Sequence, residues 1–343
     1  MSTHASIVSP RNRATVIGVA VLIGAILAGL LIGPVRIGAV NVFRWLFSFG
    51  QAPTGMSEQE ALILAELRLP RVIVAGLVGA SLAASGAAYQ AVFRNPLADP
   101  YLLGAAAGAG LGATIAVGYG PAGAIDVTVP IAAFVGALVG VGLAYGLGRS
   151  NLGGRAGTSL VLAGVAVASF LTAVQTFLQQ QRSETLRQVY TWILGRLGTT
   201  GWDDVWLALP SVALAVTTLW VVRRLLDVIE VGDVEAQSLG LNVTRLRLVV
   251  VLAASLATAA AVAVAGLIGF VGIIVPHAVR LLVGGSYRSV LPLSVLFGAS
   301  FLIIVDVLAR TVAAPAEIPI GVITALVGAP FFLVVLRRNR RAT

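Results

Sequence analysis

Few residues in this chain are suited to acid–base, nucleophilic or metal chemistry. Cysteine is absent, and the only imidazoles belong to His4 and His277, so disulfides and thiolate metal sites are excluded. A catalytic centre needs a nucleophile, a base or a set of metal ligands that converge, and the sequence offers no such set. It also lacks a GxxxxGK(S/T) motif, the usual P-loop for ATP. We therefore expect no metal site, no bound cofactor and no enzyme activity.

Arginine is the residue with the most potential for binding. The formal net charge of +9 depends on arginine alone, because the chain has no lysine. Such a basic balance occurs in nucleic-acid-binding proteins, but in an apolar chain it more often marks the cytoplasmic loops of a membrane protein. We therefore expect membrane lipid, and not nucleic acid, around this chain.

Long apolar stretches must position these arginines. Hydrophobic residues make up 58% of the chain and charged residues 11%, far from the roughly 25% charged residues of soluble domains. Stretches close to the roughly 20 residues that cross a bilayer recur with short polar breaks. They predict an all-α membrane protein, one domain over residues 1–343, with spans near 15–33, 72–92, 101–118, 128–148, 159–178, 205–222, 247–265, 267–284, 290–309 and 318–336.

The first stretch and the distribution of arginine set the expected orientation. Residues 16–32 follow Arg11 and Arg13 but are long for a secretory signal, and no clear cleavage site follows, so we interpret them as the first span. Ten spans place both termini on one side. That side carries more arginine than the other, which favours cytoplasmic termini by the positive-inside rule.

Five segments, in order along the chain, resemble the FecCD family of permeases, which serve ATP-binding-cassette (ABC) importers of iron siderophores, haem and cobalamin. The resemblance covers nearly the whole chain after Arg68. The segments are RLPRVIVAGLVGASLAASGAAYQ (68–90), RNPLADPYLLG (94–104), VGDVEAQSLGLNV (231–243), GFVGIIVPHAVRLLVGG (269–285) and DVLARTVAAPAEIPIGVITALVGAPFF (306–332).

The resemblance implies a multi-pass permease of the inner membrane that works with several partners. These are a second copy of the chain, two cytoplasmic ATPase subunits that use ATP and Mg²⁺, and an external substrate-binding protein. The chain itself is then the translocating subunit and hydrolyses nothing.

The longest cytoplasmic connection, residues 224–246, resembles the family's coupling helices, which seat in a cleft of the ATPase. The sequence alone indicates two short helices around a glycine break, with Asp233 at the first N-cap. Ala236, Leu239 and Gly240 are the expected contacts, with Ala236 and Leu239 as a small apolar knob. A solvated amphipathic linker explains the same pattern.

Three arginines near the outer ends of spans resemble family residues that meet carboxylates of the binding protein. These are Arg68, Arg71 and Arg310, and guanidinium suits such bidentate pairing. Their spacing predicts positions near the surface. Anchoring at the membrane interface is the alternative role.

The expected cargo path runs from an outer mouth to a cytoplasmic gate. In the family a short helix in the connection 179–204 lines the mouth, where Arg182, Arg187 and Arg196 would attract anionic cargo. Salt bridges to Glu184, Asp203 or Asp204 explain these arginines equally well. The gate falls at the start of the fifth span, at Gly157, Thr158 and Ser159, where a helix N-cap is the alternative.

Two further positions within the spans invite a functional interpretation. Pro276 is expected to break the eighth helix and to leave backbone groups for His277 or a neighbouring helix to satisfy. We interpret His277 as a structural hydrogen bonder and not an iron ligand. Asp306 and Arg310 are one helical turn apart and are expected to pair.

The remaining alternatives concern energy and cargo. An ion-driven secondary transporter usually carries acidic residues at mid-membrane, and only Asp306 qualifies here. Residues 313–319 and 186–188 look closer to haem permeases than to cobalamin permeases, so the expected cargo is haem or a siderophore, with cobalamin as the alternative.

Overall fold

The computed structural model describes residues 10–48, 54–121, 125–149 and 156–339, and these are helical and contain no strand. Ten helices form the bundle: α1 (Pro10–Leu31), α4 (Leu69–Phe93), α5 (Ala105–Tyr119), α6 (Ile125–Arg149), α7 (Ala156–Gln181), α9 (Trp202–Val231), α11 (Val243–Ala265), α12 (Val271–Val283), α13 (Tyr287–Ala309) and α14 (Ile320–Asn339). Short segments join them: α2 (Ala39–Phe47), α3 (Glu58–Leu62), a π-helical turn (Ile63–Arg68), a 3₁₀ turn (Ser183–Thr185), α8 (Leu186–Ile193) and α10 (Asp233–Ser238).

Each predicted span coincides with one bundle helix, so the all-α membrane fold is confirmed. Among the described residues, α1, α6, α7, α9, α11 and α13 are long and apolar enough to cross a bilayer. Helices α5 and α12 and the first part of α14 are shorter apolar helices. The remaining bundle helix, α4, is 25 residues long and buried over most of its length.

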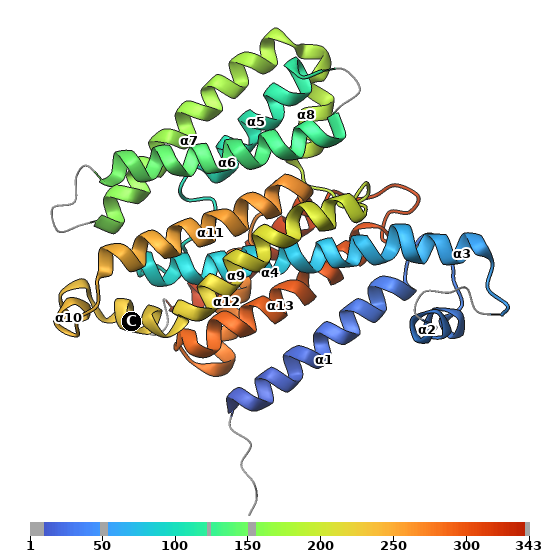
Figure 1. Cartoon of the computed structure of the whole chain (residues 1–343), viewed down its shortest axis with the longest axis horizontal. Coiled ribbons are helices and arrows are strands. Elements are labelled where there is room, and N and C mark those ends of the chain that lie inside the picture. Colours follow the sequence, from blue (N-terminus) through green and yellow to red (C-terminus); the bar gives the residue numbers. More distant parts are fainter. Residues whose placement is uncertain (1–9, 49–53, 122–124, 150–155, 340–343) are drawn as a thin grey trace, which may run out of the picture.

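Helix α4 lies at the centre of the bundle. It packs against α13, α11, α9 and α12, while α5, α6 and α7 form a second group on one side (Figure 1). Helix α1 packs mainly against α13. Because α4 is rich in alanine, glycine and serine, its neighbours approach it closely on several sides.

Glycine allows two of these approaches. A Cβ added at Gly79 would lie 2.1 Å from the carbonyl oxygen of Gly298 on α13, and one at Gly86 would lie 1.9 Å from that of Gly272 on α12. Both positions therefore have room only for a residue without a side chain.

The predicted break at Pro276 is wrong, because α12 continues through it. Proline provides no N–H for the carbonyl of the residue four positions earlier. That residue is Gly272, and its oxygen accepts a hydrogen bond from Gln90 Nε2 of α4 at 3.1 Å. A neighbouring helix thus satisfies the group that the proline leaves free. His277 makes an edge-to-face contact with Phe331, and its interpretation as a structural hydrogen bonder stays a prediction.

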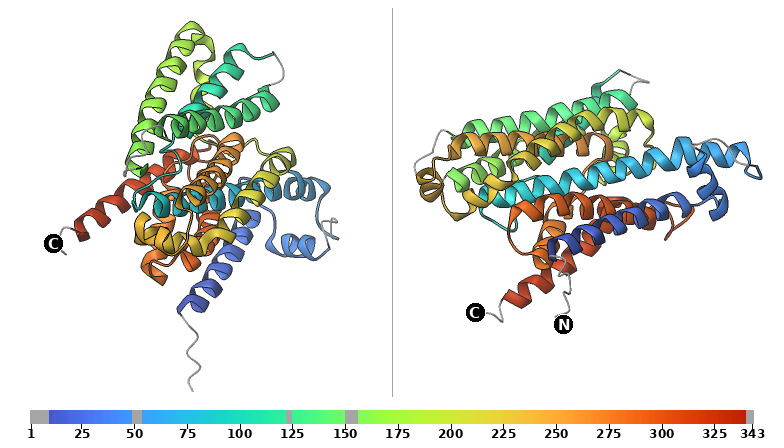
Figure 2. Two further views of the ribbon diagram at one scale, coloured as in Figure 1. Left: turned by 60° about the vertical axis from the view of Figure 1, so that its left-hand side comes forward. Right: turned by 60° about the horizontal axis from the view of Figure 1, so that its bottom comes forward.

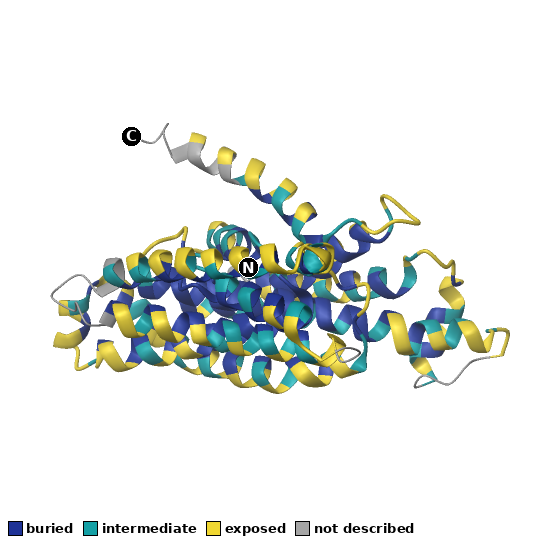
Figure 3. Ribbon diagram, turned by 90° about the horizontal axis from the view of Figure 1, so that it is seen from above, coloured by how far each residue is buried: buried dark blue, intermediate teal, exposed yellow. Residues whose placement is uncertain are grey.

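The bundle has two distinct ends. We call the one that carries α10 the α10 end, and the opposite one, where α2, α3, α8 and the connection 310–319 lie, the α8 end (Figures 1 and 2). Helix α1 begins and α14 finishes toward the α10 end. Much of α14 stands clear of the rest of the bundle and exposes apolar side chains (Figure 3).

Candidate functional site

A buried ionic cluster forms at the α8 end. Arg71 Nε and Nη2 lie 2.9 and 2.8 Å from Asp306 Oδ1, and Arg71 Nη1 lies 2.8 Å from Glu317 Oε1. Asp306 also lies 3.6 Å from Arg310 Nε, which confirms the predicted pair one turn apart. The hydrogen bonds and charge of Arg71 hold the pKa of the Glu317 carboxyl below its usual range. The cluster joins α4, α13 and the connection to α14.

Two arginines beside this cluster, Arg68 and Arg310, cap helix α1. Arg68 Nη1 donates to the carbonyl oxygens of Leu30 (2.6 Å) and Leu31 (3.2 Å), and Arg310 Nη2 donates to that of Gly29 (2.6 Å). The last carbonyls of a helix have no partner inside it and carry partial negative charge, so arginine stabilises them. Both side chains therefore hold α1 against α4 and α13.

The expected surface position of these arginines is wrong. Arg68, Arg71 and Arg310 are 4%, 9% and 3% exposed. Spacing alone did not reveal that the end of α1 and the connection 310–319 cover them. In this structure their donors face carbonyls and carboxylates of the same chain, so they shape the α8 end from beneath.

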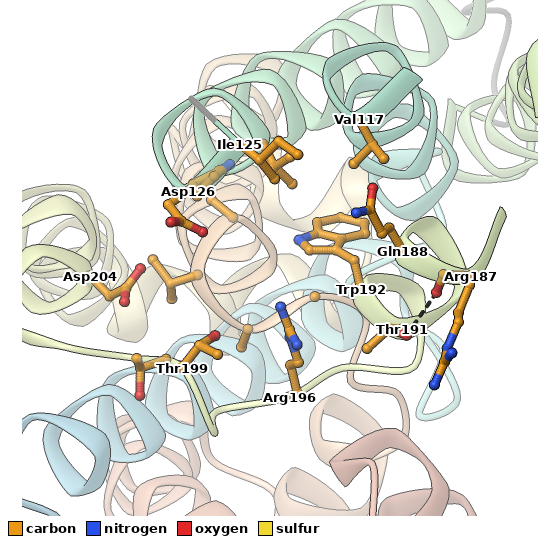
Figure 4. A pocket seen from close by; sticks show the side chains of 17 residues that line it. Val117, Ile125, Asp126, Arg187, Gln188, Thr191, Trp192, Arg196, Thr199 and Asp204 are labelled. Atoms are coloured by element: carbon orange, nitrogen blue, oxygen red, sulfur yellow. Dashed lines mark hydrogen bonds between the residues drawn. The ribbon is translucent and has the colours of Figure 1, made fainter. Parts of the chain in front are cut away.

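A cavity of about 440 Å³ opens beside α8, between the first turns of α6 and α9 and the end of α11. Arg196 points toward its centre, with Trp192 and Gln188 on one side and the carboxylates of Asp126 and Asp204 on the other (Figure 4). Arg187 borders the cavity but points away from it. The cavity thus brings one predicted path arginine, Arg196, together with two carboxylates, while Arg187 only borders it.

The third path arginine, Arg182, lies elsewhere. It is 3.7 Å from Glu184 and stacks over the ring of Tyr119 at 5.2 Å. The exposed ion pair to Glu184 is the alternative that the sequence had offered, and such pairs contribute little to stability.

The predicted gate residues lie in the first turn of α7. Because α7 begins at Ala156, neither Thr158 nor Ser159 is its N-cap. Ser159 is half-buried, and the side chain of Thr158 lies outside the described residues. The gate role itself stays a prediction.

The predicted coupling loop is shorter than expected. Helix α9 continues to Val231, so one short helix, α10, and one turn join it to α11, where two short helices were predicted. Gly240 has a φ of +81°, a value that glycine adopts readily. Gly232, and not Asp233, is the N-cap of α10.

Burial separates the three predicted contact residues. Ala236 is fully buried, whereas Leu239 is 75% exposed, and a Cβ at Gly240 would meet no atom within 4 Å. The side chain of Ala236 is therefore unavailable to any partner. Val234 and Leu239, on α10 and in the turn after it, are exposed apolar residues, as is Val231 at the end of α9.

Asp233 makes two ion pairs that the sequence did not predict. Its carboxylate lies 2.8 Å from Arg94 Nη2, at the end of α4, and 3.1 Å from Arg247 Nη2, on α11. These residues are far apart in sequence, so no local spacing could link them. Glu317 and Gln90 were missed for the same reason.

Comparison with known proteins agrees with this architecture. The cobalamin import permease BtuC of Halobacterium salinarum is 43% identical over 283 residues, covering 82% of this chain and 75% of that protein. The hemin transport permease HmuU of Yersinia pestis is 38% identical over 319 residues, which cover 91% of this chain and 92% of that protein. A solved ABC transporter assigned to the metal-chelate type, in an inward-facing conformation, superposes with a TM-score of 0.84 at 28% sequence identity. The superposition covers 95% of this chain and 99% of that chain.

The family comparison covers the same helices. Residues 21–338, from within α1 to the last turn of α14, match the FecCD transport family. The bundle, its five sequence motifs and the match together mean that the chain belongs to the FecCD transport family.

Proposed function

We propose that this chain is the membrane-spanning permease of an ABC importer for a metal chelate. It carries its cargo across the inner membrane by alternating access, and ATP is hydrolysed by separate subunits. The α10 end, toward which α1 begins and α14 finishes, faces the cytoplasm, and the α8 end faces outward.

The observation that carries this proposal is the turn around Gly240. It presents two exposed apolar side chains, Val234 and Leu239, at the end of the bundle, and Asp233 anchors the short helix behind them to α4 and α11. A small apolar tip on a firmly held helix suits a contact that transmits rigid-body motion. We assign this tip, with Gly240, as the contact for the partner ATPase.

A second copy of the chain completes the proposed pathway. Apolar side chains on α14 and α7 are exposed, among them Leu326, Leu333, Leu162 and Phe170, and α14 stands off from the bundle (Figure 3). A dimer formed through these helices would enclose a path between the two copies.

The α8 end is the proposed docking surface for a binding protein. Because Arg68, Arg71 and Arg310 are buried, we assign them the role of fixing the shape of this surface. Glu317, whose side chain is 40% exposed above Arg71, is the member of the cluster that a docked protein can reach.

Haem is the first cargo to test, with siderophores next. The hemin permease relative supports haem, and Arg196 supplies a positive group for carboxylates beside the proposed mouth. Cobalamin is the second candidate, because the relative of 43% identity is named a cobalamin import permease and because Asp126 and Asp204 line the same cavity as Arg196 and offset its positive charge.

Stimulated ATP hydrolysis separates these cargoes. The chain is reconstituted in nanodiscs with its partner ATPase and binding protein, and hydrolysis is measured with haem, a ferric hydroxamate or cobalamin as ligand. The proposal expects one ligand to raise the rate well above that of the empty binding protein. No response to any metal chelate, together with uptake driven by an ion gradient, would favour a secondary transporter.

A further inference from the structure

Arg94 adopts a backbone conformation that is unusual for its residue type. It follows the last residue of α4 with φ 49° and ψ 40°, in the left-handed region. Helices often end in this conformation, but glycine usually occupies the position because a side chain is disfavoured there. Arginine therefore occupies this position at a conformational cost that glycine would not have.

The side chain of Arg94 reaches α10. Its Nη2 lies 2.8 Å from Asp233 Oδ1 in the first turn of that helix. The same carboxylate accepts hydrogen bonds from Arg247 Nη2 at 3.1 and 3.2 Å, and the Arg247 side chain is 8% exposed. One carboxylate thus joins α10 to the central helix and to α11.

The surroundings of α10 make this junction important. Gly232 and Gly240 bound the helix on either side, and its own contribution to the core is Ala236. Two glycine turns and one small buried side chain hold a helix loosely. The ion pairs of Asp233 therefore add side-chain connections from α10 to the end of α4 and to α11, beside its packing on α9 and α11.

Helix α4 carries a second ionic connection at its opposite end. Arg71, in its first turn, is locked to Asp306 and Glu317. Between these ends the helix is buried among four neighbours. A buried helix fastened at both ends moves as a unit, because packed cores shift between discrete arrangements and do not deform continuously.

We propose that the Arg94–Asp233 ion pair is a positioning link that passes displacement of α10 into α4, and through it to the α8 end. The proposal rests on the function proposed above, in which α10 receives the movement of the ATPase. Neither residue touches cargo or nucleotide. Both act by fixing α10 to the helix that spans the bundle.

The variant Arg94→Gly tests the link without disturbing the fold. It removes the ion pair, which is 41% and 33% exposed and contributes little to stability, and it places glycine where the backbone favours it. The midpoint of thermal unfolding should therefore stay unchanged or rise. Arg245→Gln is the matched control, because Arg245 is exposed at the start of α11 and no ion pair involves it in the described part of the chain.

The measurement is the stimulation of ATP hydrolysis by cargo-loaded binding protein in the reconstituted complex. We expect Arg94→Gly to keep the basal rate of ATP hydrolysis but to reduce the stimulation by the loaded binding protein at least about 5-fold. A factor of about 5 is the lower end of the usual coupling between two sites. Arg94→Lys, which keeps the charge, should retain more stimulation than glycine. Arg245→Gln should match the wild type.

The outcomes distinguish failure of the link from failure of the proposed function. A wild-type complex without any stimulation contradicts the proposed function itself. If Arg94→Gly retains the stimulation of the wild type, the link is overturned. If Arg245→Gln loses as much stimulation as Arg94→Gly, the link is also overturned, because the loss then reflects a general effect of charge. Loss accompanied by a lower unfolding midpoint indicates a purely structural role and also overturns it.

A spectroscopic measurement on the chain alone supplies a second readout. Because the chain has no cysteine, Leu239→Cys gives a single site for a nitroxide label on the exposed tip. Arg94→Gly should increase the mobility of this label in nanodiscs, whereas Arg245→Gln should not. Equal mobility of the label in Leu239→Cys alone, with Arg94→Gly and with Arg245→Gln would contradict the anchoring of α10 by Arg94.

Discussion

Burial determines what the arginines at the α8 end do. Arg68 and Arg310 satisfy the terminal carbonyls of α1, and Arg71 binds two carboxylates at once. The sequence correctly paired Asp306 with Arg310, because residues four apart share a helix face. It could not identify the carbonyls of α1 or Glu317 as partners, since these come from distant segments.

Removing Asp306 should destabilise the protein strongly. Asp306 is 1% exposed and balances two buried guanidinium groups, and breaking a buried pair from one side costs about 3–5 kcal/mol. Asp306→Ala should therefore lower the thermal unfolding midpoint in detergent markedly. Asp203→Ala, at an exposed position in the first turn of α9, should change it little, and equal effects would contradict the account of the cluster.

Asp99, in the turn between α4 and α5, should make stability depend on pH. Burial raises the pKa of its carboxyl to about 6, although Asp99 Oδ1 accepts a hydrogen bond from the Tyr101 amide. The folded protein therefore holds this proton more tightly than the unfolded chain. The contribution of Asp99 to the free energy of unfolding should be greatest below about pH 4. It should fall by up to about 3 kcal/mol as the pH rises from about 4 through 6.

The variant Asp99→Asn isolates this contribution. Its denaturant stability, measured from pH 4 to pH 7, should lack the part of the slope that Asp99 causes in the wild type. Parallel curves for the two proteins would show that Asp99 titrates normally.

The sequence predicted which segments form helices, but it did not predict where each helix ends. Apolar stretches of about 20 residues sufficed to locate ten helices. They did not predict that α9 continues to Val231 or that α12 passes through Pro276. Both depend on neighbours: α9 packs along α11 and α4, and Gln90 satisfies the carbonyl that the proline leaves free.

The approach of α4 to α12 depends on Gly86. A Cβ there would lie 1.9 Å from the Gly272 oxygen, so Gly86→Ala must push the helices apart and should cost about 1–3 kcal/mol, as overpacking does. Gly142→Ala is the control, because a Cβ at this exposed position of α6 meets nothing within 4 Å. It should be neutral or stabilising by about 0.5–1 kcal/mol. Thermal unfolding of both variants checks the contrast.

The tip of the α10 loop should be essential for coupling but not for folding. Leu239 is 75% exposed, so Leu239→Arg should leave the unfolding midpoint nearly unchanged while it uncouples ATP hydrolysis from uptake in the reconstituted complex. Arg288→Gln serves as the control, because Arg288 is exposed in the first turn of α13 and lies outside the predicted coupling loop. Coupled transport by Leu239→Arg would remove the tip from the ATPase contact.

At the scale of the whole molecule, composition and motif order predicted the class of protein well. The apolar content, the absence of cysteine and lysine and the five segments led to a FecCD-type bundle, and the family match over residues 21–338 confirms it. The position of each candidate site residue was harder to predict. Whether an arginine faces solvent, a carboxylate or a cavity depends on which helices pack beside it.

The central claim is that this bundle moves its cargo with energy from a separate ATPase that presses on the α10 end. Uptake of labelled metal chelate into proteoliposomes tests it most directly, with the chain alone or together with its ATPase and binding protein. The account predicts uptake only in the complete complex and only with ATP and Mg²⁺, irrespective of proton or sodium gradients. Uptake by the chain alone, driven by such a gradient, would contradict it.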